Sequence, residues 1–225
     1  MSITRVLTLS TASIVMWATS LSAGAELSTY RGFQFGVSVA AVARQCGISP
    51  EPRMVDQRPE LIQELMWFPP RGGDMAGDSA QKILFTFYND QLSRVVVSYD
   101  RSRTEGLTAE DLVEAISATY GMASLPAVGM PPLVAGRTLD DKILARWEDP
   151  QSSITLFRSK YLATFGLVLI SKRLDSLATV AHAEAILLDD REAPARESAR
   201  QERRTGEDRL REETVRRLNK AAFKP

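Results

Sequence analysis

The chain has 225 residues, with 28 Lys and Arg against 28 Asp and Glu, so its formal net charge at pH 7 is zero. A balanced charge gives no reason to expect nucleic acid as a partner, and the length suits one large domain or two small ones. One cysteine excludes an internal disulfide, and one histidine excludes a zinc site built from several histidine ligands.

The first 25 residues have the composition of a secretory signal. Arg5 is their only charged residue, Val6 to Leu21 is mostly apolar, and Ala23-Gly24-Ala25 fits a small-x-small cleavage site. We expect cleavage after Ala25 and a periplasmic or secreted protein with 27 basic and 28 acidic residues. An uncleaved anchor is the alternative, although hydroxyl residues interrupt the apolar run. No later run is long and apolar enough to span a membrane.

A short strand and a short helix are expected next. Tyr30 to Gly36 predicts the strand, with glycines at both bends, and Ser38 then caps a helix that ends at Gly47. Cys46 falls on the inward face of this helix with Val39 and Val42. We interpret it as a buried small hydrophobe, with an intermolecular disulfide as the alternative.

Two further strands are predicted before a loop rich in glycine and proline. They are Met54 to Gln57 and Leu61 to Phe68, and the loop runs from Pro69 to Ala80. Trp67 and Phe68 form a large apolar group at the start of this loop. The pair either covers the edge of the sheet or forms a contact for a partner.

The stretch from Lys82 to Tyr120 is the most regular part of the chain. Its first half predicts two strands with alternating apolar residues and a tight turn between them. A three-residue turn, Asn89 to Gln91, would set Phe85 opposite Val95 and give one consistently apolar face. We therefore prefer it to a two-residue turn at Asn89-Asp90.

A capped helix follows this hairpin. Thr108 is the expected N-cap, Asp111 can complete a capping box, and Gly121 ends the helix. Arg101 and Arg103 lie in the loop just before the cap. A helix N-terminus beside two arginines can bind an anion, so Arg101, Arg103 and Thr108 are candidate anion-binding residues. We prefer the interpretation of a solvated loop that pairs its own charges, and the anion site is the alternative.

An apolar, proline-rich connector (residues 122–137) leads to a second half (138–190) that repeats the order of elements in the first half (26–121). Strands are predicted at Lys142 to Glu148, Ser153 to Arg158 and Tyr161 to Ile170. A helix with Leu and Ala on one face follows. His182 lies at the edge of that apolar stripe, which predicts a residue on the helix surface, with a pH sensor or general base as the alternative.

Residues 191–225 form a charged segment, called the tail below, with eleven basic and seven acidic residues. Opposite charges four residues apart predict a helix, which Pro194 is expected to break or kink. Few large apolar residues are available to dock this helix on its own domain, and no sustained heptad repeat favours a coiled coil. The candidate partner contacts are therefore Leu210, Val215 and Leu218 in the tail, together with Trp67 and Phe68.

Two stretches resemble a known family. The opening F-x-F-G-x-S-x-x-x-V (Phe33, Phe35, Gly36, Ser38 and Val42) and the strand-turn-strand from Phe85 are similar to the SmpA-like small outer-membrane assembly proteins. They also resemble the β-lactamase-inhibitor-protein fold, which shares that architecture. The resemblance implies a binding module and not an enzyme, and it assigns no role to any single residue.

The sequence as a whole predicts an α+β protein. We expect an antiparallel sheet built from two strands-then-helix halves, with helices on one face and a charged C-terminal helix. The favoured function is a non-catalytic periplasmic binding or interaction module without cofactor or metal, whose partner is an envelope protein. The alternatives are a small-anion-binding protein and a hydrolase that works without histidine.

Overall fold

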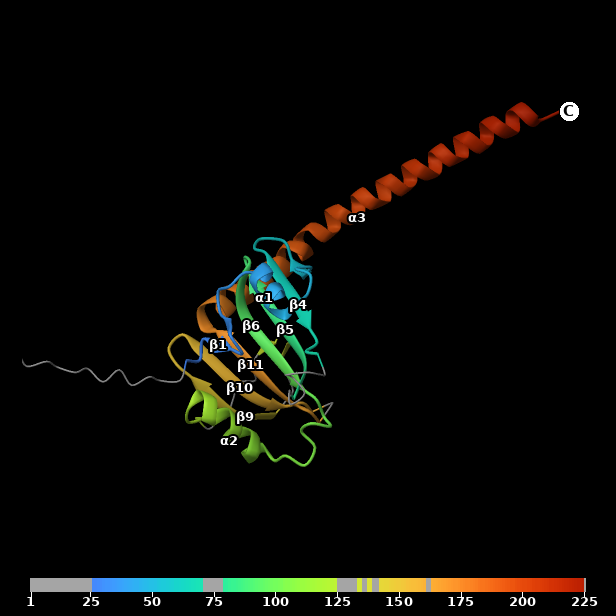
Figure 1. Ribbon diagram of the computed structural model, residues 1–225. Coiled ribbons are helices and arrows are strands. Elements are labelled where there is room, and N and C mark those ends of the chain that lie inside the picture. The colour runs from blue at the N-terminus through green and yellow to red at the C-terminus, as the bar shows by residue number, and fades with distance from the viewer. Residues whose placement is uncertain are drawn as a thin grey trace, which may run out of the picture.

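The fold centres on one seven-stranded antiparallel sheet with strand order β3-β4-β5-β6-β11-β10-β9 (Figure 1). The computed structural model describes residues 26–70, 79–124, 133–134, 137–138, 142–160 and 163–224. The expected signal at residues 1–25 and most of the expected connector lie outside the described residues.

The seven strands form two meanders, and both lie in the same sheet. Their bounds are β3 Arg53–Asp56, β4 Ile62–Trp67, β5 Ala80–Tyr88, β6 Gln91–Tyr99, β9 Lys142–Glu148, β10 Ser152–Arg158 and β11 Phe165–Ser171. The meanders join where β6 pairs with β11, with Val97 opposite Leu167 and Val95 opposite Leu169. The α+β prediction is therefore confirmed, and the two strands-then-helix halves share a single sheet.

The hairpin of β5 and β6 has the expected register but a different turn. Phe85 faces Val95 as predicted, yet the turn has two residues, Asn89 and Asp90, with φ angles of 47° and 61°. Both angles are left-handed, as the tight turns of twisted hairpins require. Thr86 pairs with Arg94 and Phe87 pairs with Leu92, so Ser93 on β6 is the extra residue of a bulge, and the apolar face is kept.

The segment predicted as one strand at Tyr30 to Gly36 is a small hairpin. Strands β1 (Thr29–Tyr30) and β2 (Phe33–Gln34) pair across a turn at Arg31 and Gly32, whose φ angles are 51° and 80°. A further short pair, β7 (Leu133–Val134) with β8 (Arg137–Thr138), was not predicted.

Helices α1 (Val39–Cys46) and α2 (Ala109–Tyr120) cover one face of the sheet. Ser38 and Thr108 cap them as predicted, each accepting a hydrogen bond from a backbone N–H in the first turn. The core beneath them contains the inward residues of all the central strands. Its largest fully buried side chains include Trp147, Phe85 and Phe87.

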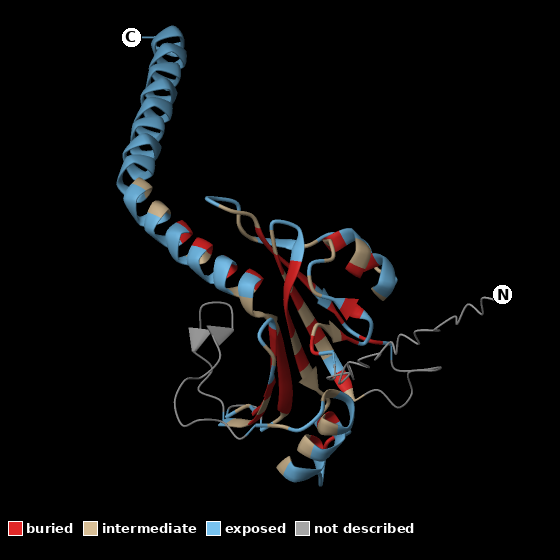
Figure 2. Ribbon diagram, turned by 90° about the vertical axis from the view of Figure 1, so that its left-hand side faces the viewer, coloured by how far each residue is buried: buried red, intermediate tan, exposed pale blue. Residues whose placement is uncertain are grey.

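Helix α3 (Lys172–Ala222) lies on the opposite face of the sheet, so the helices do not all share one face as expected (Figure 2). It buries Ala178 and Ala181 against Ile62, which points away from the main core. The helix is continuous over 51 residues and runs through Pro194 without a break. Its axis bends where it leaves the sheet, so only the weaker expectation of a kink holds.

Candidate functional site

The first half of α3 lies on the sheet through small side chains. Its buried residues are Leu174, Ala178, Ala181 and Ala185, which recur at helical spacing on one face. Alanines let the helix approach the strands closely, but each of them buries little apolar area. Polar and charged contacts around this stripe therefore have a large share in holding the helix.

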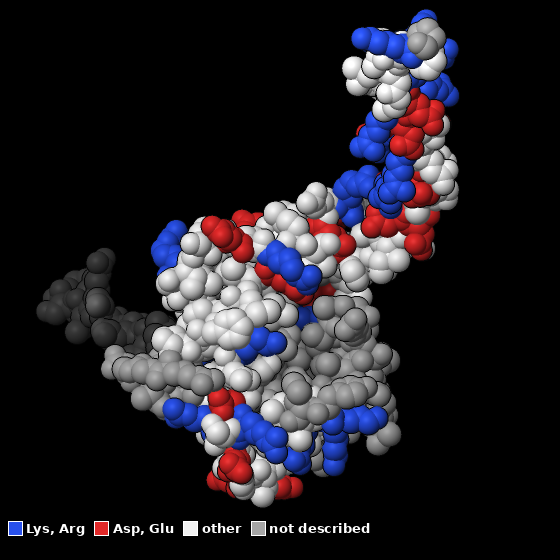
Figure 3. All heavy atoms as spheres, turned by 90° about the vertical axis from the view of Figure 1, so that its right-hand side faces the viewer, with Lys and Arg blue, Asp and Glu red and all other residues white. Residues whose placement is uncertain are grey.

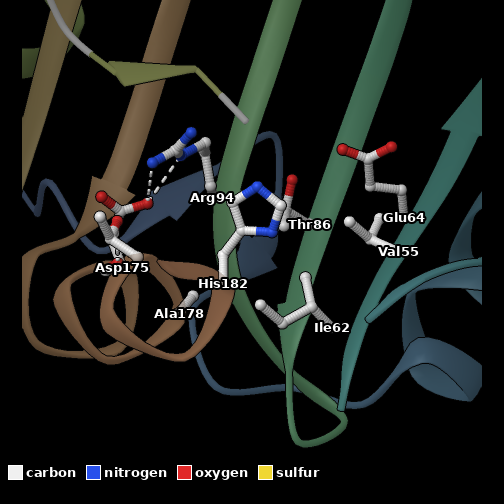
Figure 4. Close-up of a pocket in the computed structure, with 9 residues that line it drawn as sticks. Val55, Ile62, Glu64, Thr86, Arg94, Asp175, Ala178 and His182 are labelled. Atoms are coloured by element: carbon white, nitrogen blue, oxygen red, sulfur yellow. Dashed lines mark hydrogen bonds and ion pairs between the residues drawn. The ribbon is translucent and has the colours of Figure 1, made fainter. Parts of the chain in front are cut away.

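A narrow groove of about 60 Å³ runs between α3 and strands β3 to β6 (Figure 4). Apolar and charged side chains line it together, and Glu64, Arg94 and Asp175 are among the charged ones. The full lining consists of Val55, Ile62, Glu64, Thr86, Arg94, Asp175, Ala178, Thr179 and His182. The groove lies where α3 meets the sheet.

A buried ion pair joins α3 to the middle of the sheet. Nε and Nη2 of Arg94, on β6, both lie 2.6 Å from Oδ1 of Asp175, in the first turn of α3. The side chains are 7% and 15% exposed, so water screens the pair weakly. The dashed lines in Figure 4 show both contacts. The Asp175 backbone carbonyl also accepts a hydrogen bond from the Thr179 hydroxyl at 2.8 Å.

His182 faces the sheet, which corrects the expectation of a residue on the free helix surface. Its Nδ1 lies 2.6 Å from Oδ2 of Asp56 on β3, and the two side chains are 31% and 14% exposed. A carboxylate on one ring nitrogen orients the imidazole, as it does in catalytic and metal-binding sites. Among the described residues, however, no nucleophile is hydrogen-bonded to His182, and no cluster of three metal-ligating side chains exists.

Glu64 is the third charged residue in the groove. It is buried on β4 and forms an ion pair with Arg53 on the neighbouring strand β3, whose side chain is mostly exposed. Every charged side chain that lines the groove is thus paired within the protein. A groove of this kind is suited to holding a helix in place, and it presents no unpaired charge to a ligand.

The predicted anion-binding residues do not form one site. Thr108 donates to Oδ2 of Asp111 from its backbone N–H at 2.7 Å and from its hydroxyl at 2.9 Å. These hydrogen bonds lower the pKa of Asp111, so a carboxylate of the chain already occupies the helix N-terminus. Arg101 lines a broad, shallow depression elsewhere, and neither Arg103 nor Thr108 lies in that lining.

The loop that carries the arginines is shaped by Asp100. Its Oδ1 accepts from the backbone N–H and the hydroxyl of Ser102, and its carbonyl oxygen accepts from the buried Thr104 hydroxyl. Asp100 and Glu105 lie beside Arg101 in the same depression. This arrangement agrees with the preferred interpretation of a solvated loop whose charges of both signs lie together.

Trp67 and Phe68, the two apolar residues at the end of β4, differ in their exposure to solvent. Trp67 is 7% exposed and packs edge-on against Phe33, with ring centroids 6.0 Å apart. Its burial corrects the prediction of Trp67 as a partner contact. Phe68 is 62% exposed and lines the same depression as Met66 and Arg101, so of the two only Phe68 is accessible.

The tail residues keep the exposure that was predicted for them. All residues from 193 to 224 are exposed, and Leu210, Val215 and Leu218 are 65%, 55% and 65% exposed. The tail begins within α3 and continues it away from the domain (Figure 1). At its base, Glu192 pairs with Arg58 at 2.8 Å, and the hydrogen bond from Arg58 lowers the pKa of Glu192.

Cys46 lies at the inner end of α1, half-buried against the main core. Burial raises the pKa of its thiol from 9.0 to about 12. A thiol held protonated at neutral pH is a poor nucleophile and a slow partner in disulfide exchange. This agrees with the interpretation of Cys46 as a small buried hydrophobe.

Sequence reasoning missed the charged contacts beneath α3. One signal was present: Arg94 interrupts an otherwise apolar strand, on the face opposite to Phe85 and Val95. A charge at that position requires a partner, but nothing local identifies Asp175, which is 81 residues away. Asp56 likewise lies 126 residues from His182, and no pattern in the sequence links them.

Comparison with known proteins does not assign the chain to a family. No family model, no curated protein and no solved structure matches it. The similarity to the SmpA-like proteins therefore stays a prediction. Among the described residues, none of the helices combines the length and the apolar character needed to cross a bilayer.

Proposed function

We propose that the protein is a non-catalytic interaction module, exported to the cell envelope, that contacts its partner through the tail. The observation that carries this proposal is the second half of α3. It continues as an exposed helix from residue 193 to residue 222, or about 45 Å at 1.5 Å per residue. A helix of this length is stable when isolated only if its side chains support it, and the tail supplies ion pairs such as Arg196 with Glu192.

The groove supports the same reading. Arg94 and Asp175 pair with each other, Glu64 pairs with Arg53, and the only histidine ties α3 to β3 through Asp56. The domain therefore holds a helix firmly at one end and leaves the other end free. A hydrolase without histidine and a small-anion site at Arg101 remain alternatives, and neither has a converging set of groups among the described residues.

The test is an affinity co-purification from the solubilised envelope. The full-length protein is compared with a version that ends at Ala193 and with Leu210→Ser/Leu218→Ser, which keeps the helix but removes two exposed apolar side chains. A protein that is captured by the full-length chain and lost with both variants supports the proposal. Capture that survives both changes moves the contact to the sheet or to Phe68, and no capture by any version contradicts a protein partner.

A further inference from the structure

The far end of the tail differs in charge from its base. Residues 189–202 contain five acidic and three basic residues. The last acidic residue is Glu213, and the remaining charged residues up to 224 are all basic: Arg216, Arg217, Lys220 and Lys224. In Figure 3, the charged side chains at the extreme end of the tail are Lys and Arg, and Asp and Glu appear only closer to the domain, mixed with further Lys and Arg.

The same end is amphipathic. Because α3 stays helical to Ala222, residues three, four and seven apart share a face. One face carries most of the apolar side chains together with Thr214 and Arg211: Leu210, Arg211, Thr214, Val215, Leu218, Ala221 and Ala222. Arg216 and Lys220 lie on the other side with Glu212 and Glu213, and Arg217 lies at the boundary beside Leu210. Phe223 follows the helix end and is 76% exposed.

We infer that residues 210–224, called the tip below, lie on the surface of an anionic lipid bilayer. An interfacial helix combines a modest apolar face with lysines and arginines on the polar side, and the tip has both. The long basic side chains can reach lipid phosphates while their stems cover the apolar boundary. An aromatic residue next to a lysine, as in Phe223-Lys224, also suits the interface.

A second copy of the helix is a poorer occupant. A helix pair needs apolar residues that continue over several heptads, but no large apolar residue lies between Leu188 and Leu210. Pairing of two tips side by side would also bring their basic residues together. The tip carries five basic and two acidic residues, and a flat anionic surface attracts this net positive charge without requiring a matching helix.

This inference rests on the proposed function in one respect, namely that the tail makes the contact. The full-length gene is expressed, and the protein is purified as the cell accumulates it, with or without residues 1–25. The test is co-sedimentation of this protein with lipid vesicles. One set contains equimolar phosphatidylcholine and phosphatidylserine, and the other contains phosphatidylcholine alone. We expect binding to the anionic vesicles only, and weaker binding as salt is added.

Two matched pairs of variants locate the contact. Arg216→Glu/Arg217→Glu is compared with Arg203→Glu/Arg204→Glu, which changes the net charge equally in the same exposed helix. Each basic residue near an anionic surface strengthens binding roughly fivefold, so reversing the two charges in the tip should weaken it at least about 25-fold. The control should weaken it far less. Leu218→Ser is compared with Leu187→Ser, since these leucines are 65% and 62% exposed.

The outcomes separate this inference from the proposed function. Equal losses in the tip variants and their controls would overturn the assignment to the tip. Undiminished binding by a chain that ends at Arg209 would do the same. If the tail captures an envelope protein while the full-length chain ignores anionic vesicles, the lipid inference fails and the interaction module stands. If the full-length chain binds anionic vesicles but captures no envelope protein, the lipid inference stands and the proposed protein partner fails.

Discussion

The buried pair of Arg94 and Asp175 should decide how firmly α3 is docked. Substituting Asp175→Asn keeps the shape of the side chain but removes its charge, and leaves the Arg94 guanidinium buried without a counter-charge. Arg94 is only 7% exposed, so water cannot replace the lost partner.

The magnitude follows from what else holds the helix. Burial of Leu174 contributes about 1.5 to 3 kcal/mol and each of the three buried alanines about 0.8 kcal/mol, which gives about 4 to 5 kcal/mol of apolar docking. Breaking a buried ion pair costs about 3 to 5 kcal/mol, and the 15% exposure of Asp175 favours the lower end. We therefore expect Asp175→Asn to cost about 3 kcal/mol, which is more than half of this apolar contribution to docking.

Hydrogen exchange measured by mass spectrometry is the direct assay, with urea unfolding for the whole domain. Backbone amides of α3 from residue 172 to 190 should exchange much faster in Asp175→Asn, while those of β5 and β10 change little. Glu197→Gln is the matched control: Glu197 pairs with Arg200 on the exposed tail, and its loss should cost less than about 1 kcal/mol. The double variant Arg94→Met/Asp175→Leu should recover most of the protection. Unchanged exchange in Asp175→Asn would refute the reasoning.

Three further predictions concern the core and the caps. A Cβ at Gly166 would lie 2.3 Å from Cζ of Phe157, so Gly166→Ala should lower the free energy of unfolding by about 1 to 3 kcal/mol in urea. Adding Phe157→Leu should restore most of that stability. If the effects of the two substitutions were simply additive, the clash would not be the cause. The raised pKa of Cys46 predicts slow thiol labelling of the folded protein at neutral pH. The contribution of the buried, protonated thiol to stability is present below its unfolded pKa near 9 and is lost as the pH rises toward 12. Rapid labelling without denaturant would exclude that burial. Asp90 Oδ1 accepts the Val39 N–H at 2.9 Å, so Asp90→Gly keeps the turn but should cost about 1 kcal/mol in urea unfolding, whereas Asp90→Asn keeps an acceptor and should cost less.

Local patterns predicted most of the elements. Alternation placed β9 at Lys142–Glu148 with both bounds correct, and the capping residues Ser38 and Thr108 placed the starts of α1 and α2. These signals act over a few residues, where backbone geometry and side-chain hydrogen bonds determine the structure. The hairpin register followed from the burial of one face, even though the turn was assigned incorrectly, because a bulge can absorb one residue without turning the face over.

Long-range arrangement was not predictable in the same way. Nothing in either meander specifies that β6 pairs with β11 or that α3 crosses the face opposite to α1 and α2. The apolar stripe of α3 suits either face, since its alanines carry no information about what they contact. The residues that distinguish the faces are Arg94 and His182, and their partners lie far away in sequence.

The contacts that α3 makes with the sheet determine the direction of the tail. The tail continues the docked helix, so its direction is set by the contacts at its base, and a tilt of about 10° there would move the end of a 45 Å helix by about 8 Å. The ties are spread along α3, about two and then three turns apart: Asp175 to Arg94, His182 to Asp56, and Glu192 to Arg58 where the tail leaves the sheet. Small alanines alone would let the helix slide or roll. A row of charged contacts to three different parts of the first meander prevents both movements, and it gives the tip a defined position relative to the sheet.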